Sequence, residues 1–222
     1  GCHGTGNPLI MLKFQDLGYS SYQDTWELQK KMQSKRIKNE IEDTVLLVEH
    51  EPVYTFGKNT DENHLLQNYP DDVKVFRIER GGDITFHGPG QLVGYPIIDL
   101  HNYNMSISWY MRSLEDVIIH SLKYYNIEGT RKEGLPGVWV KDEKIAALGV
   151  RISRWVTMHG FALNVNTKLH YYDGIIPCGI FEYGVTSIQK ILGDEINMNK
   201  VKEILTGCFK NIFSLTKIND VN

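Results

Sequence analysis

The chain has 222 residues, of which 41% are apolar and 23% charged, and its formal net charge is −3. This length can bury a substantial core without help from disulfides or metal ions, and the charge gives no sign of a surface built for nucleic acid or membranes. No apolar run approaches the roughly 18 residues that a transmembrane helix requires.

The first residues, GCHGTGNP, show no periodicity, and we expect residues 1–10 to be a cloning remnant or a disordered start. No charged segment followed by an apolar block and a cleavage site is visible, so no secretion signal is expected. The cysteines are few and odd in number, which favours a reducing compartment over a disulfide framework. We expect residues 11–222 to form one domain in the cytoplasm or, after loss of a targeting peptide, in an organelle matrix.

The periodicity of apolar residues predicts an irregular series of helices and strands along the chain. Helical spacing is found over Tyr22–Lys38 and Ser106–Asn126, and in a last helix from Val201 to Phe213 that Asn197 or Asn199 can cap. Strands are predicted over Thr44–His50, Val73–Arg80, Asp83–His87, Gln91–Asp99, Val138–Val140, Ile145–Ile152 and Met158–Val165. Hairpins interrupted by helices favour an α+β domain, with a mixed, mostly antiparallel sheet flanked by helices.

Two of the three cysteines differ in their surroundings. Cys208 lies on the apolar stripe of the last predicted helix and is expected in the core. Cys178 stands between a proline and a glycine in DGIIPCGI and belongs to no such pattern. It is either a small buried residue or a nucleophile held at a turn.

The densest polar motif is ERGGDITFHGPGQLVGYP, from Glu79 to Pro96. Gly81 and Gly82 permit close approach of a ligand to the backbone, Arg80 can hold an anionic group, and His87 can exchange a proton near neutral pH. The alternative is a hairpin turn with a surface arginine and a hydrogen-bonded histidine. The motif is neither a dinucleotide fingerprint nor a phosphate-binding loop.

A nucleophilic Cys178 needs a neighbouring cation that lowers its pKa. Lys144, His159, Lys141 and Arg151 are the candidates, and spacing alone does not choose among them. Lys144 opens KIAALGV, whose small residues leave room for a ligand, although an ordinary turn lysine would look the same. His87, His159 and Cys178 lack the paired spacing of a metal site, and no serine-hydrolase elbow occurs.

From about Met11 onward the chain resembles the octanoyltransferase family of lipoate synthesis. The resemblance rests on RGGDITFHGPGQ, GVWVKDEKIAALGVRIS, HGFALNV, GIIPCGI and GVTSI, in this order. It implies the fold of the biotin and lipoate protein ligase catalytic domains. Two departures put the chain-length preference in doubt: Phe161 replaces a common leucine, and Asp173–Gly174 stands where an acidic residue and a histidine are common.

The resemblance also implies roles for individual residues. Cys178 would carry the acyl group as a thioester, and Lys144 would lower the pKa of the thiol and shuttle protons. The residues implied to bind substrate are Arg80, Gly81, Gly82, Asp83, Ile84, Thr85, Phe86, His87, Ala147, Leu148, Gly149, His159, Gly160, Phe161 and Ala162. Among them, Phe86, Leu148 and Phe161 are candidates for lining the alkyl chain, although each also suits the core.

The implied donor is octanoyl-acyl carrier protein, and the implied acceptors are lipoyl domains of 2-oxoacid dehydrogenase acyltransferase subunits and the glycine cleavage H protein. No ATP, metal, nucleic acid or membrane is expected to take part, and a monomer is expected. Three other functions stay open: an ATP-dependent lipoate or biotin ligase of the same fold, a non-catalytic binding module, and a cysteine hydrolase that uses Cys178 with His159.

Overall fold

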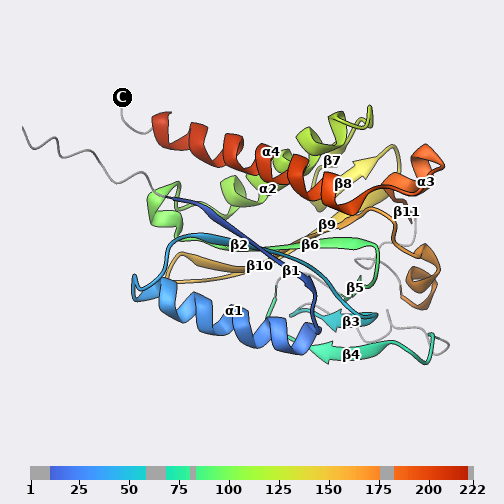
Figure 1. The fold of residues 1–222 in the computed structure, drawn as a ribbon, viewed down its shortest axis with the longest axis horizontal. Coiled ribbons are helices and arrows are strands. Elements are labelled where there is room, and N and C mark those ends of the chain that lie inside the picture. The colour runs from blue at the N-terminus through green and yellow to red at the C-terminus, as the bar shows by residue number, and fades with distance from the viewer. Residues whose placement is uncertain (1–10, 59–68, 81–83, 176–182, 220–222) are drawn as a thin grey trace, which may run out of the picture.

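A computed structural model describes residues 11–58, 69–80, 84–175 and 183–219, and it is built around one large sheet (Figure 1). The strands follow the order β1, β2, β6, β10, β9, β8, β7, and β11 pairs with β9. Their bounds are β1 Lys13–Tyr19, β2 Thr44–Glu49, β6 Gln91–Ile97, β7 Thr130–Lys132, β8 Leu135–Val140, β9 Glu143–Ser153, β10 Val156–Asn164 and β11 Gly184–Val185. The pairs β1–β2 and β9–β11 are parallel, whereas the other pairs in this sheet are antiparallel.

A second, smaller sheet contains β3 (Val53–Phe56) between β4 (Lys74–Arg77) and β5 (Ile84–His87). It lies on the same side of the large sheet as the first helix (Figure 1). Its aromatic and aliphatic side chains form their own core cluster, which includes Tyr54 and Phe86. The strand predicted from Val73 to Arg80 is confirmed as β4, which is shorter and spans Lys74–Arg77.

Helices cover both faces of the large sheet (Figure 1). On one face lie α2 (Ile107–Lys123) and α4 (Met198–Asn219), with the short α3 (Ile188–Leu192) near the end of the sheet, while α1 (Tyr22–Ile37) lies on the other. Short 3₁₀ turns cover Leu100–Asn102 and Leu169–Gly174. The Asn197 side chain accepts a hydrogen bond from Lys200 N at 3.2 Å, as expected of a cap at the start of α4.

The first helix begins and ends as predicted, but its buried face differs from the expected apolar stripe. The residues buried on α1 are Tyr22, Thr25, Gln29, Gln33 and Arg36. Trp26, Leu28 and Met32 pack beside this face and are only partly buried. Polar side chains thus hold α1 to the sheet: Gln33 Nε2 donates to Val156 O at 2.9 Å, for example.

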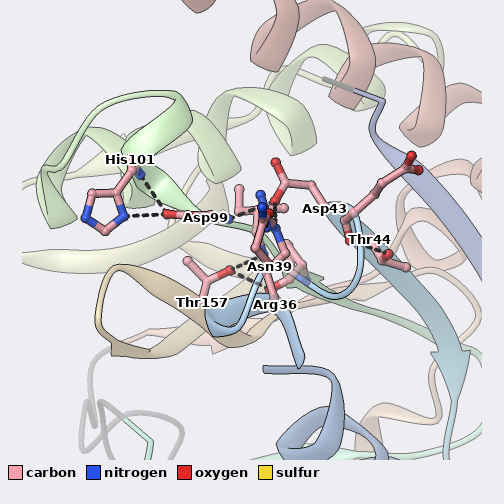
Figure 2. A network of polar contacts seen from close by, with 10 residues as sticks. Arg36, Asn39, Asp43, Thr44, Asp99, His101 and Thr157 are labelled. Carbon is pink, nitrogen blue, oxygen red and sulfur yellow. Dashed lines mark hydrogen bonds and ion pairs between the residues drawn. The ribbon is translucent and has the colours of Figure 1, made fainter. Parts of the chain in front are cut away.

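The end of α1 is fixed by a buried ion pair (Figure 2). Arg36 Nε lies 2.7 Å from Asp43 Oδ1, and the two side chains are only 6% and 0% exposed. The same carboxylate oxygen accepts a hydrogen bond from Asp99 N at 2.9 Å. Asp43 therefore joins the helix end to the segment that follows β6.

The predicted fold class is confirmed: the domain is a mixed, mostly antiparallel α+β structure. Cys208 is 7% exposed and lies in the main core cluster on α4, as expected. Within the described ranges, no helix is both long enough and apolar enough to cross a bilayer.

Candidate active site

A cavity lies between the large sheet and β5, and most of the residues predicted to bind substrate line it. It holds about 480 Å³ of empty space, counting its open mouth. Strands β9 and β10 form one wall, because Ala147, Leu148 and Gly149 pair in register with Ala162, Phe161 and Gly160. The remaining lining residues are Tyr22, Arg80, Ile84, Thr85, His87, Tyr95 and His159.

Glycines allow the strands of this wall to approach closely. A Cβ at Gly160 would lie 2.3 Å from Gly94 O, and a Cβ at Gly94 would lie 2.2 Å from the Phe161 ring. Neither atom could be accommodated without moving the neighbour. Phe161 therefore packs directly over Gly94 of β6 and presents its ring both to the core and to the cavity.

The histidines near the cavity are held neutral. Burial lowers the pKa of His87 to about 3, with His50 nearby adding to the effect. His87 Nδ1 lies 2.7 Å from Gln91 Oε1, an atom that only accepts, so Nδ1 donates and Nε2 carries the lone pair. The expectation that His87 exchanges protons near neutral pH therefore does not fit its buried position.

His50 and Tyr95 form a similar fixed pair behind the cavity. His50 Nδ1 lies 2.7 Å from the carbonyl oxygen of Ser20, so this nitrogen donates. The other nitrogen, Nε2, then accepts from the Tyr95 hydroxyl at 2.8 Å. Burial lowers the pKa of His50 and raises that of Tyr95, so both side chains stay uncharged.

His159 occupies an unusual backbone position at the far end of the same wall. Its φ is +57°, a left-handed conformation that is uncommon outside glycine, asparagine and aspartate. Its N–H donates to Gln29 Oε1 on α1 at 2.8 Å, which helps to hold this conformation. Burial, followed by the charges of Arg80 and Arg151, lowers its pKa to about 3.

Arg80 is buried rather than on the surface, so the cavity contains a cation at its edge. The side chain is 6% exposed, and its Nη2 donates to the carbonyl and hydroxyl oxygens of Thr55 at 3.1 and 3.0 Å. These bonds tie Arg80 to β3 of the small sheet. The remaining walls are apolar or neutral, which suits an uncharged chain better than a polar ligand.

Lys144 lies at the start of β9, beside a second, smaller cavity. This cavity shares the lining residues Ile84, Thr85 and Ala147 with the first, so the two cavities are neighbours along β9. Lys144 is 5% exposed, and its ammonium lies 4.9 Å from the centroid of the Trp139 ring. A buried ammonium next to an apolar cavity is unlike an ordinary turn lysine.

The other candidate cations differ from Lys144. Lys141 is exposed in the β8–β9 turn with φ +55°, and Arg151 pairs with Glu79 at 2.8 Å. His159 is neutral, as described above. Of the four candidates, only Lys144 combines a positive charge with burial against the small cavity.

Some predicted residues lie elsewhere or outside the described part of the chain. Phe86 is fully buried in the core of the small sheet, where its ring stacks on Tyr171 at 4.9 Å, and it does not line either cavity. Gly81, Gly82, Asp83 and Cys178 fall outside the described residues, as do residues 1–10.

The sequence did not single out Tyr22, His50, Tyr95 or Gln29. These residues come from α1, from the end of β2 and from β6, and only the folded chain brings them to the cavity. The signal that could have found Gln29 is the run of polar residues at helical spacing on α1. For the two tyrosines and His50 no local motif distinguishes them from core residues.

The neutral histidines predict a loss of stability in mild acid. In the unfolded chain an imidazole titrates near pH 6.5, whereas folded His87 and His159 stay neutral down to about pH 3. The unfolded state therefore binds more protons as the pH falls below about 6.5, which favours unfolding. Between about pH 7.5 and 5.5, the free energy of unfolding should fall by about 1.4 kcal/mol for each of the two imidazoles.

Urea denaturation at pH 7.5 and 5.5 measures the fall in the free energy of unfolding. NMR titration of the imidazoles shows which histidines cause it. His87→Asn should remove about half of the contribution of the pair. An imidazole of His87 that titrates near its usual value in the folded protein would contradict the prediction.

Comparison with known proteins shows close relatives over the length of the chain. Residues 21–210 match the family model of the lipoyl protein ligase A/B catalytic domain. The octanoyltransferase of Flavobacterium psychrophilum is 46% identical, covering 93% of this chain and 98% of its own length. The octanoyltransferase of Gloeobacter violaceus is 42% identical, covering 89% of this chain and 88% of its own.

Solved structures share the fold at low sequence identity. A bipartite lipoate protein ligase of Thermoplasma acidophilum superposes with a TM-score of 0.65 at 13% identity, covering 91% of this chain and 83% of that one. The biotin protein ligase of Aquifex aeolicus, in complex with biotin and ATP, gives 0.60 at 14%, covering 92% and 72%. The expected likeness to both ligase folds is therefore confirmed.

Proposed function

Because the chain belongs to the lipoyl protein ligase A/B catalytic-domain family and, within it, to the octanoyltransferases, we propose that it transfers an octanoyl or lipoyl group through a thioester on Cys178. The donor is the acyl carrier protein. The acceptor is a specific lysine on lipoyl domains of 2-oxoacid dehydrogenase acyltransferase subunits and of the glycine cleavage H protein. Residues 11–222 act as one catalytic domain, as a cytoplasmic monomer.

The observation that carries the proposal is the position of Lys144 between the two ends of the segment that contains Cys178. Ile175, three residues before the cysteine, lines the small cavity together with Lys144. Val185, seven residues after it, pairs with Lys144 in the sheet. Three residues of extended chain span at most about 11 Å, so the chain length from Ile175 to Cys178 is short enough for the proposed pairing with Lys144.

A neighbouring ammonium provides what a cysteine nucleophile needs. A free thiol with a pKa near 8.5 is only about 3% ionised at pH 7. Lowering that pKa to about 7 requires about 2 kcal/mol, which one nearby cation can supply. Lys144 would also hold a proton ready for the thiol that leaves the donor.

The transfer then divides into two steps. In the first, the Cys178 thiolate attacks the thioester carbon, a new C–S bond forms, the donor C–S bond breaks, and the departing thiolate takes a proton from Lys144. In the second, the acceptor amine attacks the enzyme thioester, a C–N bond forms, and the Cys178 thiolate leaves. The proton lost by the amine returns to Lys144. No ATP is consumed, and only one large protein partner needs to dock at a time.

The larger cavity is suited to the alkyl chain. It lies next to the Lys144 cavity along β9, and Ala147 follows Lys144 by three positions, a distance of about 10 Å along the strand. Burying about seven methylenes contributes about 5 kcal/mol before costs. Leu148 and Phe161 line this space, whereas Phe86 supports it from the core of the small sheet.

A mass measurement tests the function. The protein is mixed with octanoyl-acyl carrier protein without ATP or magnesium, and its intact mass is recorded before and after a lipoyl domain is added. We expect an octanoyl increment on the enzyme that disappears as the lipoyl domain gains it. An increment on the lipoyl domain that requires free octanoate, ATP and magnesium would support a ligase instead. Release of free acid would support a hydrolase.

A further inference from the structure

A buried hydrogen-bond network lies next to Lys144, and of its members Tyr172 also lines the small cavity. Its centre is Asn164, the last residue of β10, which is 3% exposed. Asn164 Oδ1 accepts from Gln91 Nε2 at 3.1 Å and from the Tyr172 hydroxyl at 3.2 Å. Two donors on the oxygen fix the amide, so its NH₂ group points the other way.

The fixed NH₂ group holds the strand that pairs with Lys144. Asn164 Nδ2 donates to Thr186 O at 3.2 Å, and Thr186 N donates to Lys144 O at 2.9 Å. The strand in question, β11, has only two residues, and Val185 is the one in register with Lys144. Because so short a strand has few ladder bonds of its own, the Asn164 bond is a large part of what holds it in place.

We propose that Asn164 is a positioning residue for Lys144, an inference that rests on the catalytic role of Lys144 proposed above. The chain of bonds from Gln91 through Asn164 and Thr186 sets where the backbone of Lys144 lies. The same bond anchors the chain just after the cysteine-containing segment. Small errors in the placement of reacting groups reduce rates severely, by about a hundredfold for 1 Å.

Two charged residues near Lys144, Lys132 and Glu143, are paired with other side chains, and changes at Asn164 leave these pairs intact. Lys132, on the same Trp139 ring, lies 2.9 Å from Asp142. Glu143, the neighbour of Lys144 on β9, lies 3.2 Å from Lys190. A change in the ionisation of the thiol in an Asn164 variant would therefore report on the placement of Lys144 relative to Cys178.

The chain offers a matched control two residues further on. The Asn166 side chain also bridges two segments: its Nδ2 donates to Ile196 O at 2.7 Å, and its Oδ1 accepts from Ile196 N at 2.9 Å. This bridge joins the chain to the segment before α4 instead of to β11. Asn166→Ala thus removes side-chain to backbone bonds of a similar kind without touching the strand that pairs with Lys144.

The experiment compares Asn164→Ala, Asn166→Ala and Lys144→Ala in the full chain. Octanoyl transfer gives kcat and KM, and the rate of thiol alkylation by iodoacetamide against pH gives the ionisation of Cys178. For Asn164→Ala we expect kcat to fall about tenfold to a hundredfold, with little change in KM for the donor. The alkylation curve should move to higher pH, in the same direction as for Lys144→Ala, while Asn166→Ala keeps both the wild-type curve and kcat.

An unchanged curve and kcat in Asn164→Ala would overturn the proposal, as would an equal change in Asn166→Ala. If Asn164→Ala does not fold, Tyr172→Phe decides, because it removes one donor that orients the amide and keeps the ring beside Phe86. A curve moved to higher pH supports the proposal, and a wild-type curve refutes it. If Lys144→Ala itself leaves the alkylation curve unchanged, the proposed role of Lys144 fails, and that result is separate from the Asn164 result.

Discussion

Cys178→Ser is expected to lower octanoyl transfer by about 10³-fold or more and to abolish the acyl-enzyme at the same time. The reason is that the nucleophile must ionise before it attacks, and a serine hydroxyl is far less acidic than a thiol. The positive charge of an ammonium can stabilise a thiolate at neutral pH, but it cannot shift the pKa of a hydroxyl far enough to ionise it. Removing a covalent nucleophile elsewhere has cost factors of this size or larger.

Intact mass and turnover, measured on the same sample, check this prediction. Cys208→Ser is the matched control, because Cys208 lies in the core on α4 and not at either cavity. Its replacement places a hydroxyl in the core at a cost of about 1–3 kcal/mol, which should lower stability and leave the acyl-enzyme intact. Full turnover by Cys178→Ser, or loss of the acyl increment in Cys208→Ser alone, would refute the assignment.

Much of this site was predictable because its walls are continuous in the sequence. The segments around Ala147–Gly149 and His159–Ala162 are strands, and paired strands bring consecutive residues to one surface. The small residues of KIAALGV were expected to leave room for a ligand, and Ala147 and Gly149 do line the cavity. The spacing of apolar residues along the chain was enough to predict the main strands and helices, and the order of the motifs indicated the fold.

What the sequence did not reveal depends on contacts between distant segments. The buried face of α1 is polar, so its apolar residues gave the wrong impression of which side faces the sheet. Gln33 and Gln29 can be buried because they bond to Val156 O and His159 N. These partners are distant in the sequence, so no local pattern predicts them. The neutral state of His87 likewise depends on burial and on His50, which is far away in the sequence.

Asp43→Ala is expected to destabilise the domain by about 3–5 kcal/mol, the largest stability effect that we predict. The carboxylate is fully buried and pairs with Arg36, and it also accepts the Asp99 N–H (Figure 2). Without it, the guanidinium is left buried next to no opposite charge, and that desolvated charge is the main cost. Urea denaturation at pH 7 measures the change in the free energy of unfolding.

The neighbouring residue provides the control for this prediction. Glu42 pairs with Lys13 at 3.2 Å, but these side chains are 48% and 60% exposed, so Glu42→Ala should cost less than about 1 kcal/mol. The double variant Arg36→Met/Asp43→Leu should recover much of the loss, because it removes both buried charges and fills their space. If Asp43→Ala were no worse than Glu42→Ala, the ion pair could not be what fixes the end of α1. Since Gln29 on that helix holds the left-handed turn at His159, loss of this anchor should also weaken binding of the acyl chain.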